Sequence, residues 1–216
     1  MFDGDRINVL VIENQKMLQD LVRELRAQIE GYDGRFVLSE NLSEMRIDRS
    51  VLLTIDPFSI DLNQRDLLTK LYAKMKEDAF GVDEYVHTSG LLTEIMARVQ
   101  ELMNRQPILL KSSEVDLPLL FRSMNVSFSE SESMLEALHD FVDICSEYRG
   151  TRLFVFVNIK SYLNNQEILE LYSHLRYVKK NVLLIERSET EHLEGENIRI
   201  IDSDLCEINF DKNYIN

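Results

Sequence analysis

Four short runs of consecutive apolar residues form the most regular pattern in the chain. They are rich in β-branched and aromatic side chains, and each is followed by a polar residue: Val9–Ile12 by Glu13, Val51–Ile55 by Asp56, Leu153–Val157 by Asn158, and Val182–Ile185 by Glu186. Runs of this kind are typical of strands buried on both faces of a parallel sheet. The carboxyl ends of such strands line ligand crevices, so the four polar residues predict a site there; alternatively, they only end strands or cap helices.

Helix-like and strand-like stretches alternate around the first two runs. Apolar residues from Met17 to Ile29 follow the spacing of an amphipathic helix. Gly31 and Gly34 indicate a turn, and Arg35–Leu38 is a candidate strand. Strand, helix and strand in this order form a βαβ unit, which predicts a doubly wound α/β sheet.

The character of the chain changes after Asn63, which we expect to be the N-cap of a helix. From Leu67 to about Tyr148 the apolar residues keep helical spacing. Ser129, with Glu132 three residues later, predicts a capping box before the last of these helices. We therefore predict a helical subdomain inserted into the α/β head.

The chain then returns to the pattern of the head. Asn164 begins a predicted helix, short strands are expected at Ile198–Ile201 and Leu205–Ile208, and the tail from Phe210 is expected to be frayed. The predicted domains are a discontinuous α/β head, residues 1–63 and 149–216, and a helical leg, residues 64–148.

The composition favours a cytoplasmic protein without a membrane span. No run approaches the roughly 18 apolar residues that a transmembrane helix needs, and the chain shows no secretory signal pattern. Cys145 and Cys206 have no CxxC partner, so zinc is not expected, and Cys145 is predicted to lie in the core. The formal net charge of −14, taken alone, argues against a nucleic-acid partner, because phosphates require a positive surface.

Motifs for nucleotide binding and for common catalytic mechanisms are absent from the sequence. The chain has seven glycines, with neither a P-loop motif nor GxGxxG, so ATP hydrolysis by the usual route is not expected. The four histidines show no paired spacing, and His139 and His174 are interpreted as structural. One catalytic alternative remains, a metal-dependent nuclease or phosphoesterase in which Glu13, Asp56 and Asp61 hold a divalent cation.

Basic residues gather in the predicted leg. Lys70 and Lys74 are one helical turn apart, Lys76 is close by, and Arg98 and Arg105 follow. Such charges usually form only a solvated helix face. If copies of the chain formed a ring, however, the repeated charges could line a positive channel for DNA while the outside stayed acidic.

The order and wording of several segments resemble the Csn2 family, the small adaptation proteins of type II-A CRISPR loci. The segments are VLVIEN at Val9–Asn14, LLTIDPFSIDLN at Leu52–Asn63, FVFVN at Phe154–Asn158 and NVLLIERS at Asn181–Ser188. The helical insertion between the second and third segments has the length expected for this family. The similarity covers nearly the whole chain.

This resemblance implies a Rossmann-like head, related to P-loop ATPases but without a working phosphate loop, and a helical leg. It also implies a homotetrameric ring that threads double-stranded DNA from its ends through a lysine-lined hole. The family acts in the acquisition of new spacers, together with the Cas1–Cas2 integrase and the Cas9 effector. No catalysis is implied.

The family further implies calcium sites that order the legs. Only Glu114 falls on an acidic position of the family's ligand run, and Asp116, Glu130 and Glu132 complete the set predicted here. Family members also carry a strand pair before the first strand, whereas about eight residues precede it in this chain, so contacts of that hairpin are not expected.

The leading hypothesis is a non-enzymatic, sequence-independent double-stranded DNA-binding ring that acts in spacer acquisition. Charge and periodicity, rather than matches to the family, select its predicted DNA contacts: Lys70, Lys74, Lys76, Arg98 and Arg105. Two alternatives stay open. One is the metal-dependent nuclease described above, and the other is a protein-interaction scaffold that docks basic partners on its acidic surface and never binds DNA.

Overall fold

The computed structural model describes residues 7–40 and 42–210, which fold as two compact units. One unit, here called the head unit, combines the chain up to Leu62 with the chain from Glu130 onward. The second, here called the insertion unit, is Asn63–Ser129.

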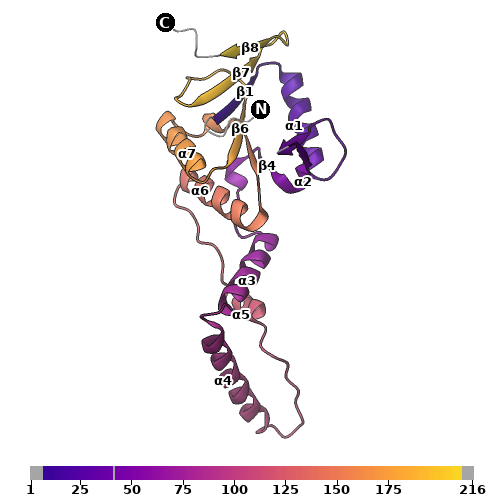
Figure 1. Cartoon of the computed structure of the whole chain (residues 1–216), viewed down its shortest axis with the longest axis vertical. Coiled ribbons are helices and arrows are strands. Elements are labelled where there is room, and N and C mark those ends of the chain that lie inside the picture. Colours follow the sequence, from indigo (N-terminus) through magenta and orange to yellow (C-terminus); the bar gives the residue numbers. More distant parts are fainter. Residues whose placement is uncertain (1–6, 41, 211–216) are drawn as a thin grey trace. The chain divides into compact units, whose positions relative to one another are not determined.

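A mostly parallel sheet of six strands forms the centre of the head unit, counted over the residues that the structure describes (Figure 1). From edge to edge its strands are β4 (Val51–Thr54), β5 (Leu153–Val157), β6 (Asn181–Glu186), β1 (Ile7–Ile12), β7 (Glu196–Ile201) and β8 (Glu207–Phe210). All neighbouring strands are parallel except β8, which runs antiparallel to β7. The four apolar runs are therefore confirmed as neighbouring strands of one parallel sheet.

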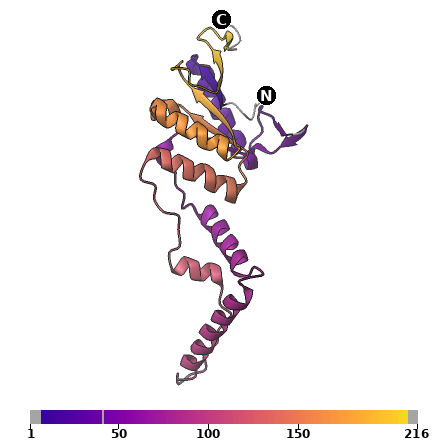
Figure 2. The ribbon, with the colours of Figure 1, turned by 60° about the vertical axis from the view of Figure 1, so that its left-hand side comes forward.

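Helices cover both faces of this sheet (Figures 1 and 2). α1 (Gln15–Ile29) and the short α2 (Ile47–Ser50) lie on one face, and α6 (Met134–Ile144) and α7 (Asn165–Tyr177) lie on the other. All five residues of β5 are buried, as expected for a strand between two helical layers. The ring of Phe154 in this strand packs against Phe141 of α6, with the ring centroids 6.4 Å apart.

α6 begins later than the sequence predicted and belongs to the head unit. Its N-cap is Ser133, whose hydroxyl accepts the backbone N–H of Glu136 at 3.1 Å, so the capping box expected at Ser129 and Glu132 is wrong. The two Ser–Glu pairs have the same spacing, but only the later pair directly precedes the buried face of the helix. The insertion unit consequently ends at Ser129, earlier than the boundary at residue 148 in the sequence analysis.

The candidate strand Arg35–Leu38 does not join the main sheet. Leu38–Glu40 (β2) instead pairs antiparallel with Ser43–Met45 (β3) in a separate hairpin. This segment is solvent-exposed, with Val37 73% exposed, so it lacks the two-sided burial of the parallel strands. The crossover that starts with β1 and α1 therefore ends at β4, on the edge of the sheet.

The last strand is displaced from its predicted position. Leu205 has a positive φ of 66° and lies in the turn, so β8 covers Glu207–Phe210 rather than Leu205–Ile208. The tail that was expected to be frayed lies, beyond Phe210, outside the described residues.

Candidate nucleic-acid interface

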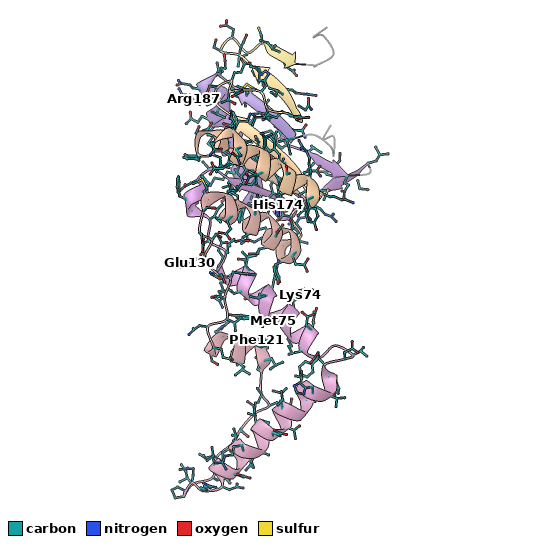
Figure 3. The ribbon with its side chains drawn as sticks, turned by 90° about the vertical axis from the view of Figure 1, so that its left-hand side faces the viewer. Lys74, Met75, Phe121, Glu130, His174 and Arg187 are labelled. Atoms are coloured by element: carbon teal, nitrogen blue, oxygen red, sulfur yellow. The ribbon has the colours of Figure 1, made fainter. Side chains whose placement is uncertain are left out.

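The insertion unit contains three helices within its described residues: α3 (Arg65–Ala79), α4 (Tyr85–Met103) and α5 (Leu117–Ser123). α3 packs against α5 through the rings of Tyr72 and Phe121, whose centroids are 6.1 Å apart. The Tyr72 hydroxyl also donates to the carbonyl of Val126 at 2.7 Å. Figure 3 labels Met75 on α3 and Phe121 on α5, the two helices that make this packing.

Asn63 joins the two ends of the insertion unit instead of capping α3. Its side-chain NH2 group donates to the carbonyl of Phe128 at 3.1 Å, and its Oδ1 accepts the Phe128 N–H at 2.9 Å. The N-cap position belongs to Gln64, which makes no capping bond, so the predicted cap is wrong. Both the NH2 group and the oxygen of the Asn63 side chain are therefore bonded to the backbone of one residue, 65 positions later.

The three lysines predicted to contact DNA are all exposed on α3. A helix turns about 100° per residue, so Lys70 and Lys74 lie about 40° apart on one face. Lys76 lies about 200° from Lys74 and points to another side of the helix. Figure 3 shows Lys74 on this helix. The structure thus brings two of the three lysines onto a common face.

The two predicted arginine contacts lie on α4 and just after it. Arg98 Nη1 is 2.7 Å from Glu101 Oε2, and both side chains are about 60% exposed, so this ion pair contributes little. Arg105 follows the end of α4 and is exposed. Both guanidinium groups can therefore meet a phosphate at small cost.

α4 has no buried residue within this chain, although it carries an apolar stripe. Leu91, Ile95, Val99 and Leu102 recur at intervals of three and four residues and are 37–49% exposed. This spacing places the four apolar side chains in one stripe along α4.

The negative charge is distributed unevenly between the two units. Residues 63–129 contain eight Lys and Arg against nine Asp and Glu, a net charge of −1. The head unit carries the remaining −13 of the total of −14. The argument from net charge against a nucleic-acid partner therefore applies to the head unit and not to the insertion unit.

The polar residues at the strand ends do not form the metal site of the nuclease hypothesis. β4 and β1 are separated by β5 and β6, which places Asp56 and Glu13 about 14 Å apart at a strand spacing of about 4.8 Å. Asp56 instead caps a short 3₁₀ helix, Pro57–Ser59, by accepting the N–H of Phe58 at 3.0 Å. The expectation that these side chains converge with Asp61 on one cation is wrong, because β1 and β4 are not neighbours.

The side chains of Asn158 and Asn14 also accept hydrogen bonds from backbone N–H groups of this chain. The side-chain oxygen of Asn158 accepts the N–H of Arg187 at 3.0 Å, across the ends of β5 and β6. Asn14 caps α1 by accepting the N–H of Met17 at 3.0 Å. Only two residues connect β1 to α1, so no loop is available there to wrap a phosphate group.

A buried group of charged side chains in the head unit was missed by the sequence analysis. Lys160 Nζ is 2.6 Å from Glu196 Oε1, and the Tyr172 hydroxyl donates to the same oxygen at 2.5 Å. Glu186 accepts the backbone N–H of Lys160 at 3.2 Å. Burial, reinforced by the charge of Glu196, raises the pKa of Glu186 to about 7 against the opposing effect of Lys160. The sequence feature that could have indicated this group is an acidic residue at the end of an otherwise apolar strand.

The histidines interpreted as structural lie between α6 and α7. The rings of His139 and His174 stack with their centroids 4.3 Å apart, and His174 Nε2 is 2.9 Å from Asp143 Oδ1. Burial lowers the pKa of His139, and the neighbouring His174 adds to this effect. Cys145, predicted as a core residue, is fully buried at the end of α6. The two histidines therefore lie at the contact between α6 and α7.

The four residues predicted to bind calcium are divided between the two units of the chain. Glu114 and Asp116 belong to the insertion unit, Glu130 and Glu132 belong to the head unit, and all four are exposed. Across residues 7–40 and 42–210, no group of three or more His, Cys, Asp or Glu side chains has a metal-binding arrangement. Calcium requires six to eight oxygen ligands, and a site made of these four acids stays a prediction.

These features define a class of protein: an α/β protein with a mostly parallel sheet, an inserted helical unit and no phosphate loop after its first described strand. No helix in the described part of the chain is long and apolar enough to span a membrane. The family model for CRISPR-associated protein (Cas_Csn2) matches residues 28–205, and the chain belongs to this family.

Individual relatives are distant. The CRISPR-associated protein Csn2 of Streptococcus agalactiae is 20% identical over 183 residues, which are 82% of this chain and 80% of the relative. Among solved structures, a bacterial Atm1-family ABC exporter with ATP bound is similar over 93% of this chain and 32% of its own, with 10% identity and a TM-score of 0.38. The chain therefore spans about a third of that exporter's length.

Proposed function

We propose that this protein binds double-stranded DNA without sequence preference and without catalysis, as a homotetrameric ring, during CRISPR spacer acquisition in the cytoplasm. The observation that carries the proposal is the set of exposed cations in a helical unit of net charge −1, in a chain whose remaining charge is −13. Membership in a family of CRISPR-associated proteins supports the role in antiviral defence. The Cas1–Cas2 integrase and Cas9 are the partners that the family resemblance implies.

The uncovered stripe on α4 supports assembly of several copies. A 19-residue helix that buries none of its residues gains little from its own chain, since most helical stability in proteins comes from packing of an apolar face. Association through this stripe would cover Leu91, Ile95, Val99 and Leu102 and would repeat the lysines of α3 by symmetry. A ring of this kind would give each DNA duplex several sets of cations.

The mechanism of binding would be electrostatic. Lysine and arginine side chains that contact phosphates release condensed counterions, so the logarithm of the binding constant falls with the logarithm of salt concentration by about 0.9 for each phosphate contacted. Contacts to the phosphate backbone carry no sequence information, which accounts for the absence of sequence preference.

The test combines DNA topology with charge reversal. A gel-shift titration compares linear duplex with covalently closed circles of the same sequence, for the wild type and for the triple variant Lys70→Glu, Lys74→Glu, Lys76→Glu. The matched control reverses three exposed cations of the head unit: Lys16→Glu, Arg152→Glu and Lys179→Glu. We expect the wild type to prefer linear DNA, and the α3 variant alone to lose at least tenfold in affinity with a shallower salt dependence.

Other outcomes identify the alternatives. Equal binding to closed circles would rule out threading, and unchanged affinity of the α3 variant would remove these lysines as DNA contacts. Cleavage products in the presence of magnesium or manganese would revive a nuclease, although the separation of Glu13 from Asp56 argues against that site. If neither the wild type nor any variant bound DNA, the protein-interaction scaffold would be the remaining hypothesis. Calcium, which the family resemblance implies, is assigned no step in this proposal.

A further inference from the structure

The two faces of the head sheet are covered unequally. Two long helices, α6 and α7, lie on one face, whereas α1 is the one long helix on the other among the described residues (Figure 1). α1 is strongly amphipathic, yet Leu25 is its one buried residue. Leu18 and Val22 of this helix and Leu183 of β6 pack against the core but stay only partly buried. Among the described residues, this side of the head unit therefore keeps an apolar surface that is only partly buried.

A groove of about 470 Å³ follows this incompletely covered surface. Its apolar lining residues, here called the floor, are Leu18 and Val22 on α1 and Ile55, which follows β4 and is 43% exposed. The groove residues of α1 extend from Gln15 to Arg26, which is three helical turns or about 16 Å. This length suits a short helix or an extended peptide better than a compact small molecule.

The rim of the groove is basic in a unit that is otherwise strongly acidic. Arg23, Arg26 and Arg187 line it, and no Asp or Glu is among its lining residues. Arg23 and Arg26 pair with Asp20 and Glu30 of the same helix, but both arginine side chains are about 70% exposed. Exposed pairs of this kind contribute about 0–1 kcal/mol, so the guanidinium groups can turn to another carboxylate with little loss.

Arg187 adds a third charge from a different element, since it follows β6 whereas Arg23 and Arg26 lie on α1. It is exposed directly after β6, and its backbone N–H is held by Asn158, which fixes where the side chain starts. Figure 3 shows Arg187 in the head unit. Arginine presents five N–H donors in a planar fork, a geometry that matches a carboxylate.

We propose that this groove, floored by Leu18, Val22 and Ile55 and rimmed by Arg23, Arg26 and Arg187, docks an acidic amphipathic helix of a partner protein. Charge complementarity selects the occupant: the rim requires carboxylates, and the floor requires apolar side chains of the same segment. A DNA backbone would satisfy the arginines but offers nothing to the apolar floor. This surface belongs to the head unit and is independent of the DNA contacts proposed for the insertion unit.

The experiment uses the full chain and two synthetic probes. One is a fluorescent 18-residue helical peptide with Leu at positions spaced by three and four and Glu on both flanks, and its matched control has Lys in place of every Glu. Binding is measured by anisotropy at low and at high salt for the wild type and for the double variant Arg23→Glu, Arg187→Glu. Arg152→Glu is the matched protein control, because Arg152 is also an exposed arginine next to a strand end, outside the groove.

We expect the acidic probe to bind at least tenfold more tightly than the basic probe, and the double variant to reverse this preference while Arg152→Glu keeps it. Val22→Ser should weaken binding of the acidic probe several-fold without changing the salt dependence of that binding. Equal binding of both probes, or an unchanged affinity of the double variant, would overturn the proposal. Two other results would overturn it, provided that peptide binding stayed the same. Loss of duplex DNA binding by the double variant would mean that the groove binds DNA. A lower solution mass of the double variant would mean that the groove binds a second copy of the chain.

Discussion

Replacing Glu186 with Gln is expected to stabilise the head unit above neutral pH. The side chain is buried, with Glu186 only 3% exposed, and burial raises its pKa from the ordinary value of 4.5 to about 7. Between these two values the folded state holds a proton that the unfolded state has already released. Stability therefore falls as pH rises from 4.5 through 7, because the unfolded state binds fewer protons over that interval.

The size of this effect follows from the two pKa values. Each pKa unit corresponds to about 1.4 kcal/mol, so the shift of Glu186 amounts to a loss of about 3 kcal/mol by pH 8. Gln keeps an oxygen that can accept the N–H of Lys160, now accepted at 3.2 Å, but it cannot ionise. The variant should exceed the wild type in stability by only about 1 kcal/mol at pH 5 and by about 3 kcal/mol at pH 8.

Cys145 offers a probe that reports on the head unit alone. The chain has two cysteines, and Cys145 is fully buried whereas Cys206 is exposed. In a Cys206→Ser background, a thiol reagent can modify Cys145 only when the head unit opens. The modification rate, divided by the rate for the unfolded chain at the same pH, is the equilibrium constant for opening, and this constant gives the free energy of opening. Measurements at pH 5, 6, 7 and 8 with and without Glu186→Gln supply the comparison.

Glu13→Gln is the control for this experiment, because Glu13 is an exposed carboxylate next to the same sheet. Its pH profile should follow that of the wild type. The reasoning is refuted if Glu186→Gln keeps the wild-type dependence between pH 5 and 8, or if Glu13→Gln removes it to the same extent.

Four further perturbations probe other parts of the chain. Lys160→Met leaves Glu196 buried without its cation and should lower the free energy of unfolding by about 3–5 kcal/mol in urea titrations, with partial recovery when Glu196→Gln is added. Tyr72→Phe removes the hydrogen bond to Val126 and should cost the insertion unit about 1 kcal/mol, read from hydrogen exchange of α3 amides. Ile95→Glu places a charge in the apolar stripe of α4 and should lower the solution mass measured by light scattering. Calcium at millimolar concentration should leave the Tm unchanged if the exposed acids do not form a site, whereas a clear rise would show binding to the folded state.

The sheet could be predicted because its signal is local and strong. A strand buried on both faces requires apolar side chains at every position, and the five buried residues of β5 follow this rule directly. The hairpin β2–β3 could not be placed in this way, since its short exposed strands carry no such pattern. The same limit applies to helix starts: the pairs Ser129–Glu132 and Ser133–Glu136 have equal spacing, and only packing of α6 on the sheet distinguishes them.

The candidate site was less predictable because it depends on contacts distant in sequence. The strand order separates Glu13 from Asp56, although both follow similar apolar runs, and no local pattern encodes that order. The buried network joins Lys160 to Glu196 across 36 positions, for the same reason. Lys70 and Lys74, by contrast, could be assigned to one face because helical geometry alone determines their angular separation.

Several side chains at the carboxyl edge of the sheet accept hydrogen bonds from backbone N–H groups there. In such sheets a ligand binds where backbone N–H groups at the carboxyl edge are free to meet it. Here Asn14 occupies an N–H at the start of α1, Asp56 occupies that of Phe58, and Asn158 occupies that of Arg187. These three N–H groups are therefore already bonded to side chains from the same edge of the sheet. The exposed cations of the insertion unit and the exposed apolar stripe of α4, by contrast, are features suited to binding macromolecules.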